Sequence, residues 1–153
     1  MGINMLRERS TTRPMPDEVV LPDERSASRG TALRRLGALA VLVVGAVHLE
    51  QYFEVHFDVV PVIGPLFVLN FAGAMAIGLG LLVFPFERLR ALLALGGIGL
   101  AVTSFVFFFI SEHRPLFGFE DYGYRPAILV ALAAEAATVV LLGSYLGIRA
   151  RPR

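Results

Sequence analysis

Residues 62–84 read VIGPLFVLNFAGAMAIGLGLLVF, an apolar run in which Asn70 is the only strongly polar side chain. About 20 such residues in a helix cross the roughly 30 Å hydrocarbon core of a bilayer. A segment inside lipid has to satisfy its own backbone polar groups, and a helix does so. The run therefore predicts a transmembrane helix. Pro61 and Pro65 suit its start, where a missing N–H costs little.

Three further apolar segments of similar length occupy residues 33–53, 89–110 and 126–148. The first is the weakest, because its core LGALAVLVVGAV is followed by polar side chains at the far end. Across the chain 56% of residues are hydrophobic and only 18% are charged, a composition typical of a membrane protein. The sequence therefore predicts an all-α, four-transmembrane-helix bundle over residues 32–149, with the lipid bilayer as its surroundings.

Residues 1–31 have a different composition. They are rich in Arg, acidic residues, Pro and Ser, and they lack an apolar period. Such a segment does not bury enough apolar surface to fold, so we expect a disordered cytoplasmic tail. No small-residue cleavage site follows the first apolar segment, so we expect that segment to be retained as an anchor rather than removed as a signal peptide.

The placement of arginine predicts the orientation in the membrane. All 14 basic residues are arginines: seven lie before or in the first turn of the first span, two lie in FERLR (86–90) and three in RARPR (149–153). The other two connections hold only Arg114 and Arg125. Cytoplasmic loops carry an excess of Arg and Lys, so both termini are expected to face the cytoplasm. The absence of lysine fits a GC-rich bacterial genome, and hence a multi-pass protein of a bacterial cytoplasmic membrane.

Composition also bounds the chemistry. The basic residues are scattered among segment ends rather than gathered on one face, so no nucleic-acid partner is expected. Cysteine is absent, which excludes disulfides, thiolate ligands and membrane enzymes that shuttle disulfides. The chain contains no metalloprotease HExxH, no nucleophile elbow and no phosphate loop, so no catalytic residue is assigned.

Three polar side chains share one depth in the predicted bundle. At about 1.5 Å per residue, Glu135 lies roughly 13 Å below the outer end of its helix, and His48 and Asn70 lie roughly 8 to 14 Å below theirs. Each charged group in hydrocarbon costs about 2.5 to 3.5 kcal/mol and calls for a partner. One interpretation is a buried cluster that carries protons or holds a ligand. The other is that Glu135 is protonated and His48 neutral, and that both only join helices through hydrogen bonds.

A second hypothesis concerns the outer connections. Imidazole and carboxylate groups suit Zn or Cu, and four such side chains follow the first and third spans: His56, Asp58, Glu112 and His113. His56 and His113 also fit the two axial positions of a haem. No pair of histidines has the four-residue spacing that places two ligands on one helix face. Solvated helix ends without any cofactor are therefore the expectation, with haem or Cu/Zn as the alternatives.

Small residues four apart recur in the spans and allow helices to approach closely in lipid. They are Ala72 with Ala76 and Gly80, Gly97 with Ala101, and Gly143 with Gly147. We expect these residues to pack within the bundle, with a dimer face as the alternative.

Four short motifs follow one another along the chain: HL (48–49), IGPLFVLN (63–70), LFGFED (116–121) and AAE (133–135). In this order and spacing the chain resembles a family of small four-helix integral membrane proteins of actinobacteria that has no assigned activity. The resemblance covers residues 35–145. It implies a four-helix bundle in the cytoplasmic membrane, and the matching pieces include all three residues of the polar cluster.

Three classes of function remain open. The first is a small structural or accessory membrane protein that acts through self-association or within a larger membrane complex. The second is a redox, metal, haem or proton-handling protein that uses the outer-leaflet polar cluster. The third is a transporter or channel, which would need a homo-oligomer because four helices enclose little space.

Overall fold

The computed structural model describes residues 24–54, 56–118 and 125–150. Within these ranges the chain forms four α-helices and one short 3-10 helix. They are α1 (Glu24–Glu54), η1 (Phe57–Val59), α2 (Ile63–Val83), α3 (Glu87–His113) and α4 (Pro126–Arg149). All four α-helices are long and apolar enough to cross a membrane. The predicted all-α, four-transmembrane-helix bundle is confirmed, and the chain is a multi-pass membrane protein.

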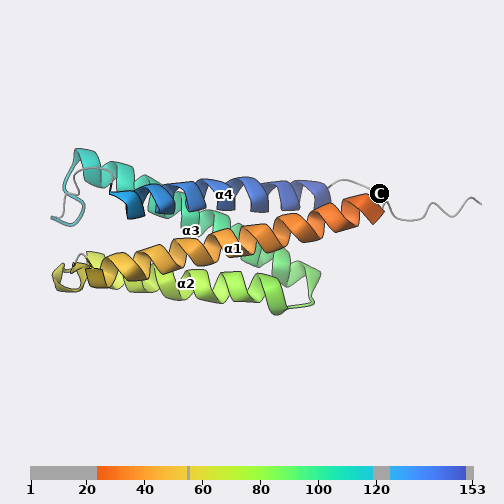
Figure 1. The fold of residues 1–153 in the computed structure, drawn as a ribbon, viewed down its shortest axis with the longest axis horizontal. Helices are drawn as coiled ribbons and strands as arrows, with labels where there is room; N and C mark the ends of the chain where they lie inside the picture. Colours follow the sequence, from red (N-terminus) through yellow and green to blue (C-terminus); the bar gives the residue numbers. More distant parts are fainter. Residues whose placement is uncertain (1–23, 55, 119–124, 151–153) are drawn as a thin grey trace, which may run out of the picture.

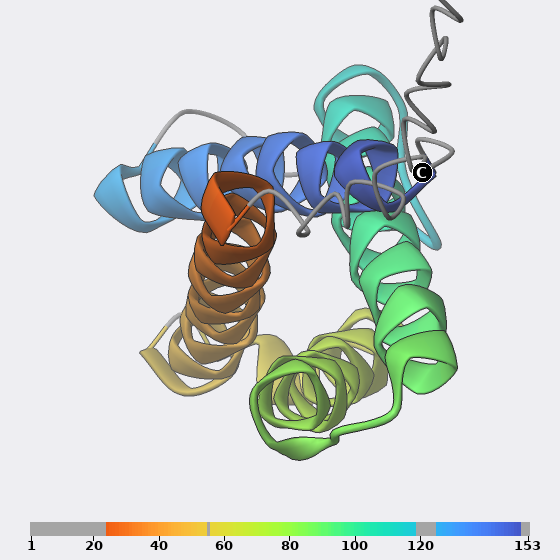
Figure 2. The same cartoon turned by 90° about the vertical axis from the view of Figure 1, so that its right-hand side faces the viewer.

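The helices run alternately up and down along one long axis (Figure 1). α1 packs against α2 and α4, and α3 packs against the same two helices, so α1 and α3 lie on a diagonal (Figure 2). One end of the bundle holds the start of α1, the end of α4 and the α2–α3 turn, and we call it the turn end. The opposite end holds η1 and the start of α4, and we call it the loop end.

The first helix is longer than expected. Residues 1–23 of the predicted disordered tail lie outside the described residues, but residues 24–31 are helical, so the boundary predicted at residue 31 is wrong. Once a span has nucleated a helix, each added residue costs little, and the Ala and Arg of this segment are good helix formers. The 31 residues of α1 extend about 46 Å, so its first turns project beyond the hydrocarbon at the turn end.

Proline sets two of the helix boundaries. Pro85 follows Phe84, whose extended backbone ends α2 and begins the turn to α3. Pro126 occupies the first position of α4, where its missing N–H is not needed. α3 continues to His113, past the predicted end at residue 110, so Glu112 and His113 belong to a helix rather than to a loop.

The packed core lies toward the turn end. Its buried members come from all four helices: Ala38, Val41, Ala74, Leu81, Ala94, Leu142 and Tyr145. Small residues bring α1 and α2 close together: a Cβ placed on Gly78 would lie 2.6 Å from Cγ of Leu42. Such close packing is what drives helix association when lipid, rather than water, surrounds the bundle.

Only part of the predicted small-residue packing occurs. Gly80, Gly97 and Ala101 are buried inside the bundle as expected. The prediction is wrong for four residues on outward faces, which are exposed: Ala72, Ala76, Gly143 and Gly147. The helix rotations direct the neighbouring Ala74 and Leu142 inward instead, so spacing alone did not identify the packed face.

Polar contacts close the turn end. Arg34 of α1 is 7% exposed and donates a hydrogen bond to the backbone carbonyl of Leu81 in the last turn of α2. Arg149 of α4 donates to the carbonyl of Glu87 at 2.6 Å and to the Tyr145 hydroxyl at 3.1 Å. The Glu87 carboxylate also forms an ion pair with Arg90, in which Oε1 of Glu87 lies 2.6 Å from Nη1 of Arg90. These contacts join α1 to α2 and α3 to α4 at this end.

Candidate functional site

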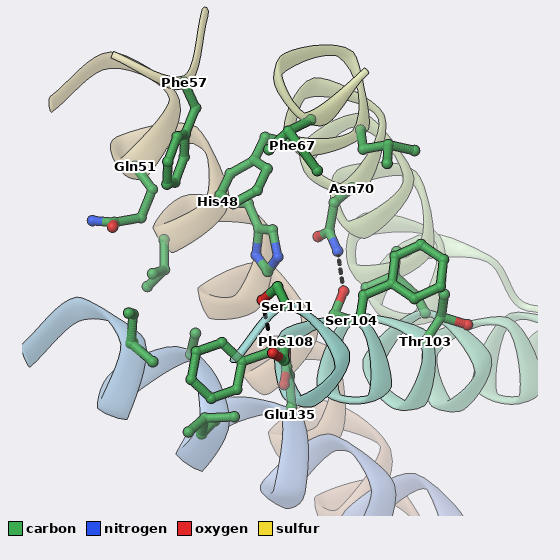
Figure 3. A pocket seen from close by; sticks show the side chains of 18 of the residues that line it. His48, Gln51, Phe57, Phe67, Asn70, Thr103, Ser104, Phe108, Ser111 and Glu135 are labelled. Carbon is green, nitrogen blue, oxygen red and sulfur yellow. Dashed lines mark hydrogen bonds between the residues drawn. The ribbon is translucent and has the colours of Figure 1, made fainter. Parts of the chain in front are cut away.

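A cavity of about 390 Å³ occupies the loop-end half of the bundle (Figure 3). All three residues of the predicted polar cluster line it: His48 of α1, Asn70 of α2 and Glu135 of α4. α3 contributes Ser104 and Ser111 to the same wall. The equal depth predicted from helix rise thus corresponds to one shared space, with a polar side chain from each helix.

Aromatic side chains form much of the remaining wall. The apolar lining includes Phe57, Phe67, Phe107 and Phe108. The ring of Phe67 lies 4.8 Å from that of Phe57 and 5.0 Å from the imidazole of His48. The loop end thus has bulky phenylalanine rings between the helices, whereas the core at the turn end includes several alanines. The larger side chains hold the helices further apart at the loop end and leave space between them.

Glu135 is the most unusual group in the lining. Its residue is 3% exposed, and its Oε2 is buried with no hydrogen-bond partner among the described residues. The hydroxyl of Thr138, one turn along, donates its hydrogen to the Ala134 carbonyl at 2.8 Å and not to Glu135. Burial of a carboxyl costs free energy unless a counter-charge or a hydrogen-bonding group lies next to it. A bound molecule that supplied such a group would lower this cost.

His48 has one ring nitrogen committed to its own helix. Nδ1 lies 2.8 Å from the carbonyl oxygen of Val44, and since a carbonyl only accepts, Nδ1 carries the hydrogen. In the neutral ring Nε2 is then an acceptor. Figure 3 shows the imidazole directed into the cavity, on the side where Ser111 and Glu135 lie. The residue can therefore accept a hydrogen bond from a bound molecule.

Asn70 and Ser104 link α2 to α3. The Asn70 amide nitrogen donates to the Ser104 hydroxyl at 2.5 Å, while Asn70 Oδ1 is buried with no partner in the described chain. Gln51 shows the same pattern: its Nε2 donates to Glu50 at 2.6 Å, and its Oε1 is buried without a partner among the described residues. Both side chains spend their donors inside the protein and keep an acceptor at the cavity.

Sequence reasoning did not assign Gln51, Ser111 or the phenylalanines to this site. Helical spacing indicates for two of them that they share a helix face with another polar residue of the cavity. Ser111 is seven residues after Ser104 and Gln51 is three after His48, so each pair lies on one helix face. The phenylalanines gave no comparable signal, because aromatic residues are common on lipid-facing surfaces as well.

The cavity opens sideways between α2 and α3. Three of its lining residues are also exposed on the outside of the bundle: Leu69 of α2, and Gly99 and Thr103 of α3. In a bilayer this surface faces lipid. The Asn70–Ser104 hydrogen bond joins the same two helices, so it lies at the opening.

The four candidate metal ligands do not line this cavity. His56 and Asp58 are neighbours, with Nδ1 and Oδ1 4.0 Å apart, but the His56 side chain is 82% exposed. His113 bonds through Nδ1 to the Phe109 carbonyl at 2.8 Å and is exposed. Within the residues that the structure describes, no three His, Asp or Glu side chains come together as metal ligands. The metal and haem hypotheses therefore rest on the sequence alone.

No protein-family model, curated protein or solved structure matches this chain. The site is accordingly interpreted from its own geometry.

Proposed function

We propose that this protein binds a small, largely apolar molecule, taken from the bilayer, in the loop-end cavity. One observation supports this most directly: Glu135, a carboxyl-bearing residue only 3% exposed, lines a cavity of about 390 Å³ and has a buried oxygen without a partner in the described chain. Ligand sites of proteins typically have about 300–1,000 Å³, mostly apolar walls and a few placed polar groups. The cavity has each of these properties.

The position of the opening supports a ligand that dissolves in lipid. Leu69, Gly99 and Thr103 put the entrance on the lipid-facing surface between α2 and α3, not at a water-filled end. Phenylalanine rings provide a wall that favours an aromatic or aliphatic body. The polar side chains then orient one polar group of the ligand in the interior.

The arginine distribution supports a position of the cavity in the outer half of a bacterial cytoplasmic membrane. Twelve of the 14 arginines lie before or in the first turn of the first span, at the start of α3, or in the C-terminal segment, and two lie in the other connections. With the turn end in the cytoplasm, the cavity takes its ligand from the outer leaflet. The motifs described above support an actinobacterial family as the source of the chain, with both termini inside.

Photolabelling tests the proposal. A long-chain alcohol carrying a diazirine is incorporated into nanodiscs with the protein, activated, and mapped by mass spectrometry. We expect saturable labelling of cavity-lining residues. Ala131→Phe fills the cavity and should abolish this labelling. Ala133→Phe is the matched control, because it makes the same change on the same helix at an exposed position outside the lining. Labelling spread over all lipid-facing residues and unaffected by Ala131→Phe would contradict the proposal.

A second candidate, the accessory role through self-association, is favoured by one feature of α4. Gly143 and Gly147 are exposed, and a Cβ built on either would meet nothing within 4 Å. A second copy could approach closely there. Cross-linking in nanodiscs should show a dimer that is lost when both glycines become isoleucine. The same change at Ala72 and Ala76, which are exposed on α2, should leave it intact.

A further inference from the structure

We infer that the ligand of the loop-end cavity is a lipophilic cation: an ammonium compound with an apolar body, whose charged nitrogen lies against Glu135. This inference rests on the proposed binding function and names the chemical class of the ligand. It follows from which hydrogen-bonding groups the cavity leaves unused, from its one buried carboxyl and from its aromatic walls.

Several buried acceptors of the cavity lining are unused. Three buried oxygens that line the cavity have no hydrogen-bond partner among the described residues: Gln51 Oε1, Asn70 Oδ1 and Glu135 Oε2. One N–H of the Gln51 amide is donated to Glu50, and one N–H of the Asn70 amide is donated to Ser104. Nδ1 of His48 is spent on Val44, which leaves Nε2 as a further acceptor. The ligand that complements this lining is therefore a hydrogen-bond donor.

The charge of the Glu135 carboxyl narrows the class of ligand further. Ion pairs in the described chain engage Glu87 and Asp58 but do not engage Glu135. The ionised form of Glu135 would gain no counter-charge from a neutral alcohol, and it would repel an anion. An ammonium group supplies both the charge and up to three N–H donors. A charge pair inside a low-dielectric site is also stronger than one in water.

The other charged or titratable groups of the lining are His48 and Arg125. Arg125 does not supply the counter-charge, because its guanidinium lies over the Phe57 ring, 5.8 Å from the ring centroid, at the loop end. It precedes Glu135 by ten residues, or about 15 Å along α4. A ligand entering between α2 and α3 would reach the carboxyl without passing Arg125.

The aromatic lining also suits a cation. Phe67, Phe107 and Phe108 line the cavity beside the polar groups. A cation over an aromatic face is attracted by the ring quadrupole, and more strongly where water is excluded. The same rings pack against an apolar body, so one surface serves both parts of the ligand.

Competition between two matched compounds tests the inference. Naphthylethylamine and naphthylethanol share one skeleton and differ in an ammonium against a hydroxyl group. Each is titrated against the diazirine alcohol in nanodiscs of uncharged lipid, and its concentration is corrected for measured partitioning. In the wild-type protein we expect the amine to displace the probe at about one tenth of the alcohol concentration, the ratio that about 1.4 kcal/mol produces.

Two variants separate charge from shape. Glu135→Gln keeps the size of the side chain and should bring the amine-to-alcohol ratio to one. Glu135→Asp keeps the charge and should keep the preference for the amine. Equal displacement by both compounds in the wild type, or a preference that survives Glu135→Gln, would overturn the cation. Displacement by neither compound, together with labelling insensitive to Ala131→Phe, would overturn the binding function itself.

Discussion

The side-chain amide of Asn70 donates a 2.5 Å hydrogen bond to the hydroxyl of Ser104, and this bond ties α2 to α3 where the cavity opens to lipid. Hydrogen bonds between transmembrane helices contribute about 0.6 kcal/mol on average and up to about 1.7 kcal/mol. A contribution of this size would help to hold α2 against α3 beside the cavity.

A double-mutant cycle checks this contact. Asn70→Ala and Ser104→Ala should each destabilise the protein, and the double variant should lose less than the sum. The expected coupling is about 0.6–1.7 kcal/mol. Unfolding by sodium dodecyl sulfate in mixed micelles gives the three free energies. Additive effects of the two single changes would mean that the bond contributes nothing to stability.

The buried guanidinium at the turn end gives a second prediction. Arg34 donates to the Leu81 carbonyl, one of the last carbonyls of α2 and hence one without a partner inside that helix. Arg34→Met keeps the apolar stem but removes the donor, and should cost about 1.5–3 kcal/mol of unfolding free energy. Arg35→Met is the control: Arg35 is adjacent but exposed, and its loss should change stability by less than about 0.5 kcal/mol. Equal effects of the two changes would contradict the prediction.

Gly64 offers a test of close backbone packing at the loop end. A Cβ placed there would lie 2.6 Å from the carbonyl oxygen of Phe57, and a backbone atom does not move aside as a side chain does. Gly64→Ala should therefore destabilise the η1–α2 corner by about 1–3 kcal/mol. Gly143→Ala meets nothing within 4 Å and should be neutral or slightly stabilising, because Ala favours a helix more than Gly. The same SDS titration compares them, and a neutral Gly64→Ala would show that the corner can shift.

Reporter fusions test the orientation. The loop end holds η1 and the end of α3, and the turn end holds the start of α3 (Figure 1). A phosphatase reporter that is active only outside the cytoplasm should be active when fused near residue 57 or 118 and inactive near residue 87, because arginines concentrate at the turn end. The reverse pattern would place both termini outside and the cavity in the inner leaflet.

The polar cluster illustrates how far sequence alone extends. The depth of His48, Asn70 and Glu135 followed from a constant rise per residue, and the structure places all three on one cavity. Depth did not say which way each side chain points. Gly143 and Gly147 had the spacing of a packed pair yet are exposed, because the rotation of α4 is set by contacts of Leu142 and Tyr145 with the other helices.

Element boundaries show the same division. Pro85 and Pro126 mark helix ends through local backbone chemistry, and the predicted ends near them are correct to within a few residues. The start of α1 was not predictable in this way. Residues 24–31 have no apolar period, and their helix continues from the span that follows.

The sequence by itself determined the four spanning helices and the level at which their polar residues lie. These follow from bilayer thickness and from the need of each backbone to satisfy its own hydrogen bonds, conditions that act on each segment separately. Only the tertiary structure decided that His48, Asn70 and Glu135 share one cavity that opens between α2 and α3. That outcome depends on helix rotation and on side-chain volume, with small residues closing the turn end and phenylalanines keeping the loop end apart.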